Sequence, residues 1–188
     1  RYPYDDPSGK FVLHDTGRGL SGGAEARVSF SAPSWNRLTL GAEGAVHAVR
    51  FLVDTTTGDT SFEDDRTLTG VAVYAVDEVD AGSRVRLTAG ARLDRLGISG
   101  DLVLSPRIAA VLRPYAAGRT KIVLGSAYRA PSPYEQYYSD GDVTEMRAGP
   151  LDAETIETAE VEHAHSLGRR GAITASVFGS RIRDLIGE

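Results

Sequence analysis

Apolar and polar side chains alternate with a period of two residues along most of this chain. The clearest case is segment 84–94, in which Val, Leu and Ala occupy every second position and Arg, Thr, Gly and Asp fill the others. Successive side chains leave opposite faces of a β-strand, so this period is typical of a strand with one apolar and one polar face. The pattern therefore predicts an all-β fold.

Turn-forming residues divide this pattern into about eight antiparallel strands. Many are near ten residues long, which is the length that a tilted strand needs to cross a bilayer. Segment 67–77 is apolar on both faces, so alternation does not orient it. Segment 153–167 is rich in Ala and Glu, which favours a helix by propensity. The expected strands are 21–31, 37–53, 67–77, 84–94, 105–113, 120–129, 153–167 and 172–186.

The connections between these strands differ in length in a regular way. Every other connection is long, which places all the long ones at one end of the sheet. The expected short turns are 32–36, 80–83, 114–119 and 167–171, and the expected long loops are 1–20, 54–66, 97–101 and 130–152. Within 1–20, a short strand at 11–13 is the alternative. Outer-membrane barrels have short periplasmic turns and long extracellular loops. The fold class that we predict is an antiparallel transmembrane β-barrel, or a fragment of one.

A barrel in a bilayer must pair every backbone polar group within the sheet, with its apolar face toward lipid and its polar face toward a wet lumen. Trp35 and Tyr115 would stand at short-turn ends, where an aromatic girdle lies, or would cap a soluble core. The expected lumen side carries Glu43, Arg86, Arg92, Arg107, Arg113 and Lys121. The expected outward side carries Leu38, Leu40, Val85, Leu87, Ala89, Ile108, Leu112, Ile122 and Leu124.

Composition removes several classes of function. The formal net charge of -5 argues against a nucleic-acid partner, which would require clustered Lys and Arg. The chain has no cysteine, so disulfides and thiol chemistry are excluded. It has no run of 18 apolar residues that would form a transmembrane helix. No nucleophile elbow, phosphate loop or His-Glu-x-x-His motif is present, so we predict neither an enzyme nor a cofactor.

The histidines offer a metal site as one interpretation. His163 and His165 are two residues apart and share a face on a strand, and with His47 they would suit a transition metal. A pair of surface or lumen histidines is the interpretation that we adopt, so no metal site is predicted.

One long composite of motifs resembles a known family. It consists of SPRIAAVLRP at 105–114 followed by KIVLGSAYRAPSPYEQYY at 121–138. This stretch resembles the mid-barrel segment of TonB-dependent outer-membrane receptors. Leu151, Glu154, Thr155 and Glu160 match a further family pattern, although Ala153 stands where the family has proline. The same resemblance favours a strand over a helix at 153–167.

The resemblance implies that residues 1–188 are an internal piece of the receptor barrel, without its plug domain. It implies uptake across the outer membrane of a Gram-negative cell, with a scarce ligand such as a ferric siderophore or cobalamin. The partners would be outer-membrane lipid, a small-molecule or metal-chelate ligand and, through the plug, the TonB complex. The expected ligand contacts are Arg129, Tyr134, Glu135, Tyr137, Tyr138 and Asp140. Arg129 and Glu135 would equally serve as a structural pair that ties loop to wall.

Two rival functions stay open at this point. One is a small structural or adhesive outer-membrane barrel, closed by about eight strands. The other is a soluble β-barrel that binds a small apolar ligand. An internal piece of a larger barrel would instead be an open sheet with two unpaired edges.

Overall fold

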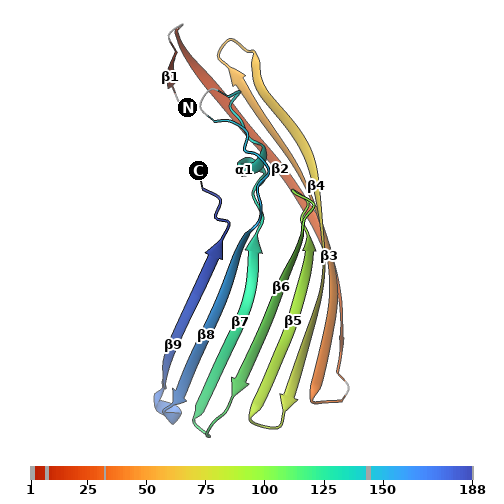
Figure 1. Ribbon diagram of the computed structural model, residues 1–188, viewed down its shortest axis with the longest axis vertical. Coiled ribbons are helices and arrows are strands. Elements are labelled where there is room, and N and C mark those ends of the chain that lie inside the picture. Colours follow the sequence, from red (N-terminus) through yellow and green to blue (C-terminus); the bar gives the residue numbers. More distant parts are fainter. Residues whose placement is uncertain (1–2, 7–8, 32, 143–144, 188) are drawn as a thin grey trace.

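The computed structural model describes residues 3–6, 9–31, 33–142 and 145–187. The chain forms one antiparallel sheet in which the strands follow one another in sequence order, from β1 to β9 (Figure 1). The strands are β1 (Pro3–Asp6), β2 (Gly9–Phe30), β3 (Asn36–Thr55), β4 (Thr60–Ala81), β5 (Val85–Arg95), β6 (Leu102–Leu112), β7 (Gly118–Arg129), β8 (Glu154–Ser166) and β9 (Ala172–Arg183). The short helices are α1 (Pro133–Tyr137) and a 3-10 turn, η1 (Gly168–Arg170).

The prediction of an all-β, antiparallel fold of about eight strands is confirmed, with the short β1 in addition. The ambiguous segment 153–167 forms strand β8. It pairs with β7 on one side and β9 on the other, and these two ladders override the helix propensity of its Ala and Glu residues. Among the described residues, no helix is long and apolar enough to cross a membrane.

Two predicted loops were wrong. Residues 9–20 belong to β2, and most of 54–66 belongs to β3 and β4, which turn at 56–59. These segments lack a regular alternation of apolar and polar residues, but their backbones pair along ladders with neighbouring strands. The connection at 97–101 is also a compact turn, in which Leu96 accepts from Gly100 and donates to Asp101. Of the four predicted long loops, only 130–152 stays long, and its residues 143–144 lie outside the described part.

The four expected short turns lie together at one end of the sheet, the lower end in Figure 1. Residue 32, in the first of them, lies outside the described part. The β3–β4, β5–β6 and β7–β8 connections lie toward the opposite end. The predicted separation of the two sets of connections is therefore confirmed, although the predicted lengths are not.

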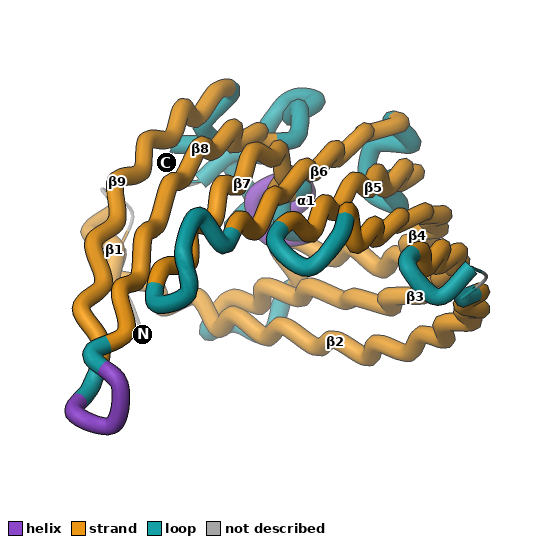
Figure 2. Tube along the Cα trace, turned by 90° about the horizontal axis from the view of Figure 1, so that it is seen from below, coloured by secondary structure: helices purple, strands orange, loops and turns teal. Residues whose placement is uncertain are grey.

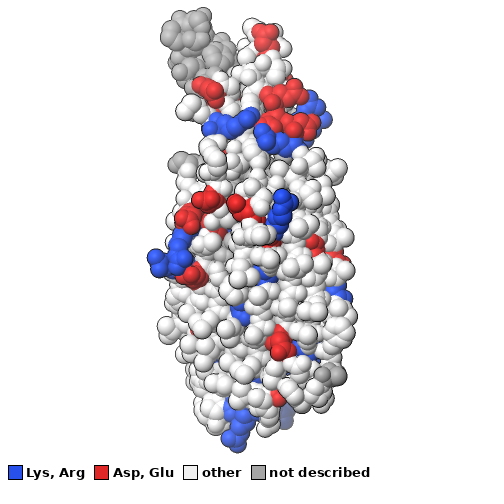
Figure 3. All heavy atoms as spheres, turned by 45° about the vertical axis from the view of Figure 1, so that its right-hand side comes forward, with Lys and Arg blue, Asp and Glu red and all other residues white. Residues whose placement is uncertain are grey.

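The sheet is curved, and α1 lies on its concave side (Figure 2). The register places Leu87 opposite Ala110, and Ala110 opposite Ile122, so the apolar rows run across neighbouring strands on the same face. All nine residues predicted to face outward share this convex face. Leu87, Ile108 and Leu124 are 44%, 58% and 50% exposed there. Charged side chains gather toward the upper part of the face shown in Figure 3, above a largely uncharged region.

On β3, β5, β6 and β7 the more polar face turns to the concave side. The register also orients β4, which alternation left undecided, because Ala72 lies opposite both Glu43 and Asp94. Tyr74 lies on the same side, and its ring covers Gly41, where any Cβ atom would overlap it. The described sheet is open, with β1 and β9 as its edges and no ladder between them.

Candidate functional site

The 130–152 loop folds back over the concave side of the sheet, and helix α1 opens it. Ser132 caps this helix: its hydroxyl accepts from the Glu135 amide at 3.1 Å, and the Glu135 carboxylate accepts from the Ser132 amide at 2.7 Å. Pro133 follows at the first helical position, where no N–H is needed. This reciprocal capping box stops β7 and starts α1 within three residues.

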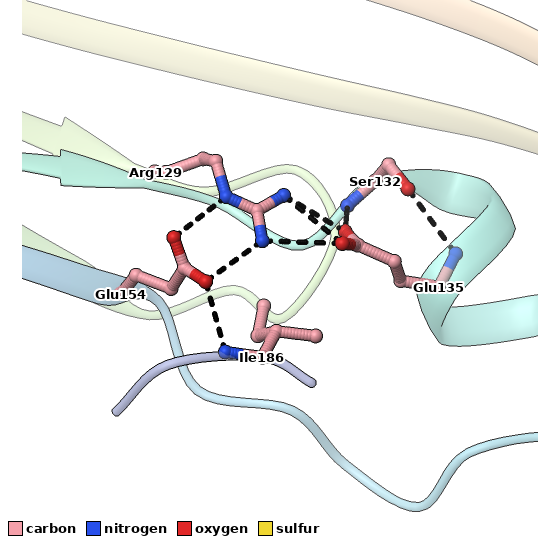
Figure 4. Close-up of polar contacts among 5 residues, drawn as sticks. All are labelled: Arg129, Ser132, Glu135, Glu154 and Ile186. Atoms are coloured by element: carbon pink, nitrogen blue, oxygen red, sulfur yellow. Dashed lines mark hydrogen bonds and ion pairs between the residues drawn. The ribbon is translucent and has the colours of Figure 1, made fainter. Parts of the chain in front are cut away.

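Arg129 ties this turn to the neighbouring strand (Figure 4). Its guanidinium donates to Glu154 of β8 at 2.7 and 2.9 Å, and to Glu135 of α1 at 3.0 to 3.1 Å. Glu154 also accepts from the amide of Ile186 at 2.8 Å. The bonds from Arg129 and Ile186 lower the pKa of Glu154 to about 2, and the bond from Arg129 also lowers the pKa of Glu135. Both carboxylates are therefore held in the charged form that the guanidinium needs.

An aromatic cluster holds the far end of α1 against the sheet. It consists of Phe51 of β3, Phe62 of β4 and the loop residues Tyr134 and Tyr138. The two tyrosine rings stack with centroids 4.4 Å apart, and Tyr138 meets Phe51 and Phe62 edge-on at 5.9 and 6.2 Å. Tyr138 is only 7% exposed. Edge-to-face and offset aromatic pairs are favourable arrangements, so this cluster fixes the loop over β3 and β4.

Charged anchors surround the aromatic cluster. Asp64 of β4 is buried and accepts from Arg66 at 2.8 and 3.0 Å and from the loop residue Arg147 at 3.0 Å. The Arg66 guanidinium lies 3.9 Å above the ring of Tyr137, whose hydroxyl donates to the Ile98 carbonyl at 2.8 Å. Two arginines thus neutralise one buried carboxylate. These contacts join the loop to β4 and, through Tyr137, to the 97–101 turn.

A cavity of about 470 Å³ lies next to the start of this loop, on the concave side. Its floor carries a charged group in which Arg92 donates to Glu43 at 2.8 Å and to Asp94 at 2.9 Å. Its apolar lining includes Leu68, Leu96, Ile98, Pro131 and Pro133. This volume falls in the range of small-molecule sites, which combine apolar walls with a few fixed polar groups.

Tyr128 enters this cavity against the alternation of its strand. Its parity in β7 matches Ile122 and Leu124, which lie on the convex face, yet it lines the cavity with Arg92 and Asp94. The β6–β7 ladder ends where Arg107 pairs with Gly125. Beyond that point β7 no longer follows β6, so the face that a side chain takes is no longer set by that ladder.

The structure brings the six predicted ligand-contact residues into one region. Tyr134 is 43% exposed, whereas Tyr138 and Asp140 are buried against the sheet. Arg129 and Glu135 join the loop to the wall, as the structural alternative proposed. Sequence reasoning missed Phe62, Asp64 and Arg66 because 54–66 was interpreted as a long loop. It placed Phe51 in strand 37–53, but no local pattern indicated its contact with Tyr138. It placed Glu43 and Arg92 on the wet face, but nothing in their spacing indicated that they would meet.

The three histidines of the metal hypothesis do not come together. His47 lies on the concave side, where its Nδ1 meets the Ser21 hydroxyl at 2.8 Å. His163 and His165 lie on the convex face, in register with Thr120 and Gly118. Among the described residues, no group of three or more His, Asp or Glu side chains is placed to hold a metal ion.

Comparison with models of protein families identifies one family for this chain. The family model described as "TonB dependent receptor-like, beta-barrel" matches residues 1–188. No curated protein sequence matches the chain.

Solved structures with the same fold include three receptors or transporters. A mutant of the ferric enterobactin receptor PfeA from Pseudomonas aeruginosa is 19% identical with a TM-score of 0.69, over 94% of this chain and 28% of that one. The siderophore receptor PirA from Pseudomonas aeruginosa is 18% identical with a TM-score of 0.71, over 92% of this chain and 36% of that one. The copper transporter OprC is 15% identical with a TM-score of 0.66, over 92% and 31%. This chain thus spans about a third of the length of those proteins, and at these identities the likeness establishes the fold.

Proposed function

Because this chain belongs to the TonB-dependent receptor-like β-barrel family, we propose that it forms part of the barrel wall of an outer-membrane uptake receptor. The proposed cargo is a scarce ligand such as a ferric siderophore or cobalamin. The match of the family model over all of residues 1–188 carries this proposal. Similar folds in a ferric enterobactin receptor, a siderophore receptor and a copper transporter support it.

The distribution of side chains on the two faces supports a membrane location. A water-soluble sheet would bury its apolar face, but here Leu87, Ile108 and Leu124 are exposed on the convex side. In a barrel that face meets lipid, and the polar concave face meets the lumen. The upper end, with the 130–152 loop, is then extracellular, and the four short turns are periplasmic.

The proposed ligand contacts adjoin the cavity through the loop, because Tyr134 follows Pro133 of the cavity lining and Tyr137 donates to Ile98 of the same lining. Tyr134 is 43% exposed, and Arg92 and Tyr128 add polar groups to the lining. Rigid aromatic faces with polar tips suit a ligand that is part apolar and part polar. Tyr138 and Asp140 would act by holding Tyr134 and Tyr137 in position, since both are buried.

The experiment uses the full-length protein in detergent and a panel of ferric siderophores plus cobalamin. Tyr134, Tyr137 and Tyr138 are replaced by Ala, singly and together, and Trp35→Phe at the opposite end serves as the matched control. We expect weaker binding of one panel member for Tyr134→Ala, with an unchanged heat-modifiable gel shift. Unchanged affinity in all three variants would remove these tyrosines from the site. A folded protein that binds no member of the panel would contradict uptake of this ligand class.

A further inference from the structure

A second group of side chains converges on one point at the other end of the molecule, on the convex face. Tyr115 lies in the turn between β6 and β7, and His163 and His165 lie on β8, one strand further on. Residues two apart on a strand share a face, so both imidazoles project from the same side. Both rings are partly exposed, and Tyr115 is 47% exposed.

Gly118 leaves the space through which the Tyr115 ring reaches β8. The ring lies against Gly118, the first residue of β7, where any Cβ atom would overlap the ring. Gly118 pairs directly with His165 in the β7–β8 ladder. The Tyr115 ring centroid consequently lies 5.9 Å from that of His163 and 5.7 Å from that of His165. A larger residue at 118 would push the phenol away from both histidines.

Three potential ligand atoms meet at the end of this ring. The Tyr115 hydroxyl oxygen is 2.8 Å from Nε2 of His163 and 3.1 Å from Nδ1 of His165. With bonds of about 2.0–2.1 Å, neighbouring ligand atoms lie about 2.9 Å apart in a square-planar site, so these separations suit the geometry that Cu²⁺ and Ni²⁺ prefer. The remaining nitrogen of His163, Nδ1, meets the Thr120 hydroxyl at 2.8 Å. A hydrogen bond at the outer nitrogen is how proteins orient a ligating imidazole.

We propose that Tyr115, His163 and His165 form a binding site for a divalent transition-metal ion. Imidazole nitrogens suit Zn²⁺, Cu²⁺ and Ni²⁺, and a phenolic oxygen with one water completes four positions. The ion takes the place of the shared hydroxyl proton between the three atoms. The site stands at the short-turn end, on the opposite face from the loop and the cavity. It therefore does not depend on the ligand proposed for them.

The test uses Cu²⁺ alone as the probe, with the full-length protein in detergent and no other ligand present. Electron paramagnetic resonance is expected to show one Cu²⁺ with two nitrogen ligands. His165→Ala should weaken the affinity at least tenfold, because even an outer-shell partner is worth about 10–100-fold. Tyr115→Phe keeps the ring on Gly118 and removes only the oxygen, so it should weaken binding with an unchanged gel shift. His47→Ala, which alters a histidine on the other face, is the matched control and should bind as the parent does.

Three results would overturn the site. Binding that persists in His163→Ala and His165→Ala would place the ion elsewhere, as would loss of binding in His47→Ala. A spectrum that shows only hydrated Cu²⁺ at millimolar concentration, with no nitrogen coordination, would mean that the three side chains form a hydrogen-bond cluster and no metal site. Because the readout is metal binding rather than uptake, failure here leaves the proposed receptor function untouched, and the reverse also holds.

Discussion

Strands β2, β3 and β4 run for 22, 20 and 22 residues, whereas β5, β6 and β7 run for 11, 11 and 12. At a rise of about 3.3 Å per residue, the first group extends for about 70 Å and the second for about 40 Å. A bilayer core is about 30 Å thick, so only the shorter group matches one tilted crossing. The longer group continues as a twisted ribbon beyond it (Figure 1).

The extra length has a different surface chemistry from the rest. On the convex side of β5 and β6 the outward residues are apolar up to Leu93 and Leu104. On β2 and β3 the same face changes above Leu20 to Arg18, which lies directly opposite Arg50. The backbone ladder is continuous through this change. Backbone pairing between strands therefore does not require an apolar convex face. In β2 and β3 the pairing continues beyond the point where the apolar face ends.

The two groups also differ in what covers them. The long strands carry the aromatic cluster and Asp64 that receive the 130–152 loop, while β7 and β8 supply the loop itself. The loop is therefore anchored twice, by Arg129 and Glu154 at its root and by Tyr138 at its far end.

The largest expected effect is the loss of stability when an arginine is placed on the convex face of a short strand, compared with the upper part of a long strand. Ala89→Arg on the convex face of β5 should destabilise the membrane-inserted protein by about 2–4 kcal/mol, because it lies near the middle of the apolar belt. Leu52→Arg in the upper part of β3, on the same face, should cost only about 0–1 kcal/mol. Urea unfolding from lipid vesicles measures both. Equal costs would mean that the upper ribbon also lies in lipid.

Changes in the aromatic cluster should have the second-largest effect on stability. Tyr138→Ala removes a buried ring from between Phe51 and Phe62, and should lower the stability of the loop by about 2–3 kcal/mol. Tyr134→Ala, at 43% exposure, should cost about 1 kcal/mol or less. Hydrogen exchange of loop amides gives both values. A larger loss for Tyr134→Ala than for Tyr138→Ala would mean that the stacking of the two tyrosines holds the loop, and not the contact of Tyr138 with Phe51 and Phe62.

The root of the loop should respond to acid. Folding lowers the pKa of Glu154 to about 2, against about 4.3 in an unfolded chain. Stabilisation by this group is therefore complete above about pH 4.3 and is lost as the pH falls toward 2. Loop protection against exchange or proteolysis should fall across that window in the parent, and Glu154→Gln should remove most of this dependence.

Arg129→Lys provides the control for geometry. It keeps the charge but cannot form two forked contacts at once, so its loop protection should be intermediate between the parent and Glu154→Gln. Protection in Arg129→Lys equal to that of the parent would show that charge alone suffices.

The smallest effect belongs to the outer surface of the long strands. The pair between Arg50 and Glu63 is half exposed on both sides. Exposed ion pairs contribute about 0.2–1 kcal/mol, so Glu63→Ala should change the free energy of unfolding by no more than that. A larger loss of stability would indicate that another part of the full-length protein covers the Arg50–Glu63 pair.

The sequence alone determined the sheet where one face is apolar and the other polar. In 84–94 and 105–129 the alternation gave the strands, the faces and the turn between them. The composite motif at 105–138 indicated the family, and the family model confirms it. The physical reason is that such a strand has one face toward apolar surroundings and one toward water. Because successive side chains leave opposite faces, apolar and polar residues must then alternate with a period of two.

Only the tertiary structure decided what lies beyond the apolar belt. Residues 9–20 and 54–66 lack the alternation of apolar and polar side chains, and their strand state depends on pairing with other strands, as when Gly17 and Asp64 both pair with Phe51. The same is true of the loop site, where Tyr138 meets Phe51 and Arg147 meets Asp64. Such contacts arise from the curvature of the sheet and the fold of the loop, which no local pattern encodes. Tyr128 is an example within a single strand, because its parity in β7 assigns it to the convex face and yet it lines the cavity on the concave side.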